Sequence, residues 1–121
     1  MCTQSLCIID GMEAIAFDTA GTLWGALRGT SALPGLYTID HTTGKATFFA
    51  PILDANGAPP SGGVVSLQFC GGTLFGGTAM AFSTINDGGR LITIAPATGL
   101  FTFVGTVSAT GGNSLDALAC Q

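Results

Sequence analysis

The sequence predicts an all-β protein, and three features support this class. Its 121 residues include 19 glycines, which supply the positive φ angles of tight turns. Only 8% of the residues are charged, against about a quarter in typical soluble domains, while threonine, which favours the pleated backbone, is frequent. The third feature is a hairpin pattern that occurs twice, at residues 36–50 (LYTIDHTTGKATFFA) and 91–105 (LITIAPATGLFTFVG). These features predict short strands joined by tight turns.

The first half of the chain divides into strands by apolar alternation and by its turn residues. A short apolar segment at residues 6–9 ends at an Asp-Gly turn and is predicted to be a leading strand. Four further strands are expected at residues 12–18, 22–26, 36–40 and 46–53. The loop at residues 54–63 (DANGAPPSGG) then combines Asn-Gly, Pro-Pro and Gly-Gly pairs, so it is expected to end this unit.

The second half of the chain repeats the first. Residues 64–69 match residues 12–17, and residues 72–76 match residues 21–25. The hairpin at residues 91–105 then completes a second set of four strands. Each repeat has about 50 residues and four antiparallel strands, which is the size of a propeller blade and more than one helical repeat needs.

The end of the chain starts the pattern a third time. Residues 114–120 (SLDALAC) match the first strand of the unit and are predicted to be a trailing strand. We therefore expect one domain over residues 1–121, with two repeats near residues 11–62 and 63–112 and a strand at each end.

Two groups of motifs in the first repeat resemble a known family. They are IAFD followed by GTLWG at residues 15–25, and LYTID followed by Thr-Gly and Ala-Thr at residues 36–47. They resemble the blade of bacterial extracellular β-propellers, which reads loosely LAFDPxGxLYG … LYTIDPTTGAATLVG. The resemblance covers most of the chain twice and implies four-stranded antiparallel blades. It implies little about function, because such blades serve many roles.

The second repeat departs from this pattern at polar positions. Cys70 stands in place of Asp18, and Ala95 stands in place of Asp40. These departures argue against a ligand site that both repeats share.

Two blades are too few for a complete propeller. A closed propeller needs at least about four blades, and two repeats cannot cover their own apolar faces. We therefore expect a homo-oligomer or head-to-tail polymer that forms through edge strands, as a closed ring of three or four chains or as a filament. The alternative fold stacks the two units face to face as a β-sandwich within one chain.

The composition excludes several classes of partner. Three basic residues stand against seven acidic ones, so the sequence has no basic surface for nucleic acid and no cluster for an anionic membrane. No apolar run approaches the ~20 residues of a membrane helix. The amino terminus lacks the basic and long apolar parts of a signal peptide. We expect an extracellular or cell-surface location, with any export signal outside this sequence.

The four cysteines are candidates for disulfides. They are Cys2, Cys7, Cys70 and Cys120, and no pair has the C-x-x-C spacing of a zinc or redox site. One or two disulfides are possible, with three pairings if all four residues join. The alternative is that they are buried free thiols that pack as small apolar side chains.

Two aromatic residues are candidate ligand or interface positions. Trp24 and Tyr37 have ring faces that suit sugar stacking. Their counterparts in the second repeat are Phe75 and Ile92, which favours a packing role instead.

Two acidic residues are the other candidates. Asp18 and Asp40 end strands, where an aspartate either supplies an oxygen ligand to calcium or bonds to its own turn backbone. No D-x-D-x-D-G loop supports calcium. His41, the single histidine, lies in a hairpin turn and is expected to be solvated. The sequence therefore predicts no cofactor, no metal and no catalytic residue.

These observations favour a non-enzymatic repeat protein that acts as a structural, self-assembling interaction module. A second hypothesis is a binding module that presents loops 29–35 and 78–89 to a carbohydrate or a protein. A third is a fragment of a hydrolase- or lyase-like propeller enzyme with an acidic channel, in which Asp18 and Asp40 would carry activity.

Overall fold

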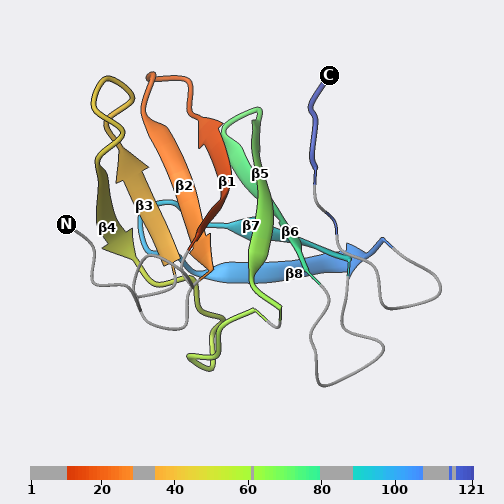
Figure 1. The fold of residues 1–121 in the computed structure, drawn as a ribbon. Helices are drawn as coiled ribbons and strands as arrows, with labels where there is room; N and C mark the ends of the chain where they lie inside the picture. The colour runs from red at the N-terminus through yellow and green to blue at the C-terminus, as the bar shows by residue number, and fades with distance from the viewer. Residues whose placement is uncertain (1–10, 29–34, 61, 80–88, 108–114, 116) are drawn as a thin grey trace.

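A computed structural model describes residues 11–28, 35–60, 62–79, 89–107, 115 and 117–121. Within these residues the chain forms eight strands in two four-stranded antiparallel sheets and no helix (Figure 1). The prediction of an all-β fold with two such sheets is therefore confirmed. The predicted leading strand at residues 6–9 lies outside the described residues.

In each sheet the strands are neighbours in space in the same order as in the sequence. Sheet 1 has the order β1-β2-β3-β4 and sheet 2 the order β5-β6-β7-β8. The strands of sheet 1 are β1 (Gly11–Phe17), β2 (Leu23–Arg28), β3 (Gly35–Ile39) and β4 (Ala46–Ala50). The strands of sheet 2 are β5 (Val64–Cys70), β6 (Thr73–Thr78), β7 (Arg90–Ile94) and β8 (Phe101–Thr106).

Strand β4 is shorter than the predicted strand at residues 46–53. It ends at Ala50 because Pro51 has no N–H to donate to the ladder. After the proline, the Leu53 N–H donates to the Gly99 carbonyl (3.2 Å) and the Phe101 N–H donates to the Leu53 carbonyl (2.9 Å). The connection between the two sheets is thus bound to sheet 2.

The trailing segment at the chain end also differs from its prediction. Its described residues, Leu115 and residues 117–121, carry no assigned strand. The Leu115 N–H donates to the Thr78 carbonyl (3.1 Å), and the Ser66 hydroxyl donates to the Leu115 carbonyl. The segment is therefore attached to sheet 2 through one residue rather than through a continuous ladder in the described part of the chain.

Both sheets contain bulges at matching positions. The extra residue is Glu13 in β1 and Val65 in β5. A second bulge contains Phe49 in β4 and Val104 in β8. Because a bulge bends its strand and increases the local twist, the matching bulges give the two sheets the same local shape.

The register defines two faces for each sheet, because directly paired residues project to the same side. Face A of sheet 1 carries Met12, Ile15, Phe17, Leu23, Tyr37, Ile39 and Phe48. Face A of sheet 2 carries their counterparts Val64, Leu67, Phe69, Leu74, Ile92, Ile94 and Phe103. Face B of sheet 1 carries Ala14, Ala16, Trp24, Ala26, Leu36 and Thr38. Face B of sheet 2 carries Ser66, Gln68, Phe75, Gly77, Leu91 and Thr93.

The core lies where face B of sheet 1 packs on face A of sheet 2. Its buried residues are Ala14, Ala16, Trp24, Ala26 and Leu36 from sheet 1, Ile52 from the connection, and Val64, Leu67, Leu74, Ile92 and Ile94 from sheet 2. Burying a leucine or isoleucine side chain contributes about 1.5–3 kcal/mol. Small alanine side chains on β1 leave room for β5, and the two strands lie next to each other (Figure 1). Unlike faces therefore meet, which leaves face A of sheet 1 and face B of sheet 2 on the outside.

Candidate functional site

Asp18 holds the turn that joins β1 to β2. Its Oδ1 accepts hydrogen bonds from the backbone N–H groups of Ala20 (3.0 Å) and Thr22 (2.8 Å). Its Oδ2 accepts one from Nε1 of Trp24 (2.9 Å). The bond from Trp24 first, and then the bond from Thr22, lower the pKa of the Asp18 carboxyl from its usual value. The arrangement makes Asp18 a turn-stabilising residue that also orients the indole.

Asp40 and Asp54 act on their own turns in the same way. Oδ1 of Asp40 accepts hydrogen bonds from the N–H groups of Thr42 (2.9 Å) and Thr43 (3.3 Å). These bonds, with the one from Thr42 the larger cause, lower the pKa of the Asp40 carboxyl. Oδ1 of Asp54 accepts from residues 56 and 58. The interpretation that strand-end aspartates bond to their own turn backbone is confirmed at Asp18 and Asp40, and Asp54 makes similar bonds within the loop after β4.

The described residues contain no group of three or more His, Cys, Asp or Glu side chains close enough to hold a metal ion. His41 is exposed, and its ring meets the edge of Phe17 at a centroid distance of 5.8 Å. Within the described part of the chain, no helix is long and apolar enough to cross a membrane.

The two aromatic candidates are not brought together. Trp24 lies on face B of sheet 1, is 8% exposed, and meets Phe49 edge-on at 5.0 Å. Tyr37 lies on face A of the same sheet and meets Phe48 edge-on at 5.4 Å. A single stacking platform built from Trp24 and Tyr37 is therefore absent from the structure.

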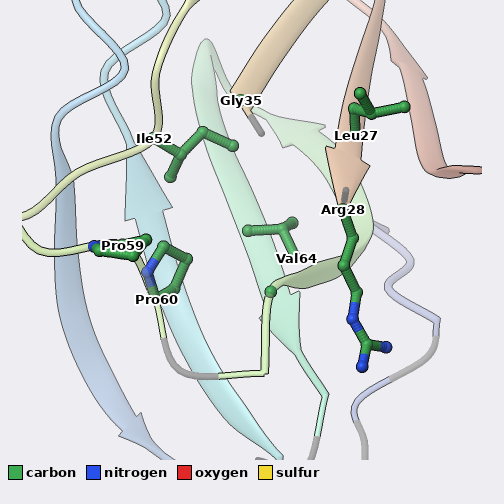
Figure 2. A pocket seen from close by; sticks show the side chains of 8 residues that line it. Leu27, Arg28, Gly35, Ile52, Pro59, Pro60 and Val64 are labelled. Carbon is green, nitrogen blue, oxygen red and sulfur yellow. The ribbon is translucent and has the colours of Figure 1, made fainter. Parts of the chain in front are cut away.

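A small cavity lies beside the connection between the sheets. Figure 2 shows Ile52, Pro59, Pro60 and Val64 around it, with Arg28 at its side. Its volume is about 180 Å³, less than the roughly 300–1,000 Å³ of typical ligand pockets. Its mostly apolar lining offers few polar groups that could orient a ligand. The loops at residues 29–35 and 78–89, expected to present a ligand, lie largely outside the described residues.

The most distinctive surface feature is face A of sheet 1. Ile15 is 57% exposed and Phe17 is 54% exposed, and Phe48 is also exposed on this face. The equivalent face of sheet 2 is the one that forms the core, where Leu67 is 5% exposed. Face A of sheet 1 is thus an apolar surface whose counterpart in the same molecule is covered by a sheet.

Face B of sheet 2 is the other uncovered sheet face, and it is more polar. It carries Gln68 and Thr93, both half-buried, with Phe75 between them. Thr102 of β8 pairs with Thr93 and is exposed on the same face. Among the described residues, Leu115 covers the inner part of this face at Ser66 and Gly77.

Comparison with known proteins assigns this chain to no group. No protein family, no curated protein and no solved structure matches it.

The sequence predicted that two repeats leave apolar faces uncovered, but it did not indicate which residues lie on those faces, because it predicted the strands without their packing. The sequence does contain one indication of which face of sheet 1 is buried. Strand β1 carries alanine at positions 14 and 16, whereas the equivalent positions in β5 are Ser66 and Gln68. Small apolar residues on one face of a strand allow close approach of another sheet. The hydrogen bond between Trp24 and Asp18 was not predicted from the sequence either, because the two side chains come together only when β1 pairs with β2.

Proposed function

We propose that this protein is a non-enzymatic, self-associating module, in which face A of sheet 1 of one copy packs on face B of sheet 2 of the next. One observation carries the proposal: inside a single chain, face B of sheet 1 already packs on face A of sheet 2. The contact between copies would repeat this arrangement between the two faces that one chain leaves open.

The same observation supports propeller-type blades. The two sheets have the same strand order and the same bulges, and they pack through unlike faces, so one sheet follows the other as a repeat. A contact between unlike surfaces is heterologous, and it builds a closed ring if the rotation closes or a filament if it does not. Three or four copies would supply six or eight blades, within the usual range of about four to eight.

The exposed apolar area gives this contact its driving force. Contiguous apolar patches of several hundred Å² commonly mark interaction sites. Ile15, Phe17 and Phe48 are large side chains on one face, and their burial contributes roughly 25 cal/mol per Å² before ordering costs are subtracted. The low charge of the chain, with a formal net charge of −4, opposes association only weakly.

The trailing segment competes with a neighbouring copy. Leu115 covers Ser66 and Gly77 on the inner part of face B of sheet 2. If a neighbouring copy packed on this face with its own β1, that strand would need the space that Leu115 occupies. Association therefore requires the trailing segment to move aside, and a variant that lacks residues 115–121 is expected to associate more strongly than the full chain.

The test measures mass in solution by light scattering after size exclusion, under reducing conditions, with electron microscopy of the same sample. We expect a discrete trimer or tetramer, or long particles. Ile15→Lys on face A and Gln68→Lys on face B should each weaken association by roughly tenfold or more. Their counterparts Leu67 and Ala16 are buried in the contact within one chain, so each contact between copies would then bury an unpaired charge. Ala55→Lys, an exposed loop substitution, is the matched control and should change nothing.

A mixing experiment then separates unlike-face contact from like-face contact. Ile15→Lys retains an intact face B, and Gln68→Lys retains an intact face A, so an equimolar mixture should form a mixed dimer through the one remaining pair of faces. A folded wild-type monomer at all concentrations would refute the proposal. A Gln68→Lys protein that assembles like the wild type would refute the unlike-face contact.

A further inference from the structure

The trailing segment follows β5 after its attachment at Leu115. Leu115 packs over Gly77, where a larger residue would leave no room, and its backbone bonds to both β5 and β6. Ala117 and Leu118 then line a cavity together with residues 65–68 of β5 and residues 13–15 of β1. Figure 1 shows the last residues running in the same direction as β5 toward the C-terminus.

This course brings the chain end to the end of β5. Five residue steps separate Leu115 from Cys120, and four steps separate Ser66 from Cys70. At about 3.3 Å per residue for extended chain, the two segments cover similar distances from their shared hydrogen bond. The two cysteines are therefore carried to the same place by the backbone.

Cys70 and Cys120 are neighbours there. Cys70 is half-buried and ends β5, and Cys120 is exposed. The interaction with the neighbouring Cys120 side chain raises the pKa of the Cys70 thiol, while the Cys120 thiol donates to the Gln121 carbonyl oxygen at 3.8 Å. Both are free thiols in the structure, and the sequence alone left all pairings of the four cysteines open.

We propose that Cys70 and Cys120 form a disulfide that fastens the end of the trailing segment to the end of β5. The inference does not require the proposed self-association, and the disulfide is expected to oppose it, because the fastened segment covers the part of face B of sheet 2 that a neighbouring copy would need. The proposal follows from the hydrogen bonds of Leu115, from the shared cavity lining and from the matching course of the two segments.

The oxidant is a small-molecule disulfide such as oxidised glutathione. The exposed Cys120 thiol loses its proton, and its sulfur attacks one sulfur of the oxidant, which breaks the S–S bond and releases one thiolate. The deprotonated sulfur of Cys70 then attacks the Cys120 sulfur of the mixed disulfide and releases the second thiolate. The two protons from the cysteines are taken up by the released thiolates, so two protein thiols are oxidised as one small disulfide is reduced to two thiols. Cys120 reacts first because it is exposed and because the raised pKa of Cys70 disfavours its thiolate.

The three basic residues make the pairing easy to read by trypsin digestion. Cleavage after Arg28, Lys45 and Arg90 places Cys2 and Cys7 in peptide 1–28, Cys70 in peptide 46–90 and Cys120 in peptide 91–121. The folded, reduced full chain is incubated with oxidised glutathione, blocked at its remaining thiols, digested without reduction and analysed by mass spectrometry. We expect peptide 46–90 joined to peptide 91–121, and a loss of about 2 Da for this bond.

Variants supply the controls. Cys70→Ser and Cys120→Ser should each lose the joined peptide, and the double variant Cys2→Ser with Cys7→Ser should keep it. Oxidation should raise Tm in the wild type and in the double variant, because both can form the Cys70–Cys120 disulfide. It should not raise Tm in Cys120→Ser, which cannot form this bond. A link from peptide 1–28 to either of the others, or free Cys70 and Cys120 after oxidation of the folded chain, would overturn the pairing.

Discussion

Ile15 and Leu67 occupy the same position in β1 and β5, yet their surroundings are opposite. Each follows the first bulge of its sheet, and each faces a glycine on the next strand. Ile15 is 57% exposed, whereas Leu67 is 5% exposed in the core. The comparison shows that strand register decides which face a residue occupies, while the packing of a second sheet decides whether that face is buried.

The sharpest way to measure this difference is to shorten both side chains. Leu67→Ala removes buried methyl groups from the core and is expected to lower the free energy of unfolding by about 2–5 kcal/mol. Ile15→Ala is expected to cost less than about 1 kcal/mol. Urea denaturation in dilute solution, where self-association contributes little, provides the measurement.

An equal loss from the two substitutions would contradict the comparison. It would mean that Ile15 is covered within a single chain. Phe17→Ala serves as a second test on the same face, because Phe17 is also half-exposed and its counterpart Phe69 packs against the core.

The turn glycines of the repeated hairpins allow a second paired experiment. Gly44 and Gly99 both have a φ of 76°, a conformation that costs an alanine about 1–2 kcal/mol. A Cβ at Gly44 would meet nothing within 4 Å, whereas one at Gly99 would run into the Pro51 carbonyl oxygen. Gly99→Ala is therefore expected to lower Tm more than Gly44→Ala does.

The comparison between the two hairpins fails if thermal denaturation gives the same Tm for both glycine variants. The larger loss of Tm is expected at Gly99 because the connection after β4 crosses the β7–β8 turn and bonds to it through Leu53. In the part of the chain that the structure describes, no equivalent segment crosses the turn at Gly44.

The smallest expected effect concerns the turns that begin each sheet. The β1–β2 turn is held by Asp18, and the β5–β6 turn by two glycines, Gly71 and Gly72, with positive φ. Because the pKa of Asp18 is lower in the folded chain than its ordinary value of 3.8, its contribution is present above that value and is lost as pH falls through the folded pKa. Asp18→Asn should flatten the loss of Tm in this acidic range.

Thermal denaturation between about pH 2 and 7 checks this prediction, with Asp40→Asn as the matched variant, since the pKa of Asp40 is lowered by its own turn. An unchanged pH profile in Asp18→Asn would show that the Asp18 carboxylate contributes no pH-dependent stability.

Much of the fold could be predicted from the sequence because it depends on local chemistry. Alternating apolar residues placed β1 and β5, and Gly44 and Gly99 marked the hairpin turns. The strand-end aspartates predicted turn bonds that the structure contains. The bulges at Glu13 and Val65 had no such signal, because a bulge depends on the partner strand as well as on its own residues.

The sequence by itself therefore determined the strand class, the repeat and the turns of this protein, since these follow from the conformations that neighbouring residues prefer. Only the tertiary structure decided that unlike faces pack, that Ile15 stays exposed while Leu67 is buried, and that the trailing segment attaches to sheet 2 through Leu115. These features join residues far apart in the chain. They depend on how whole faces fit together, which no local pattern records.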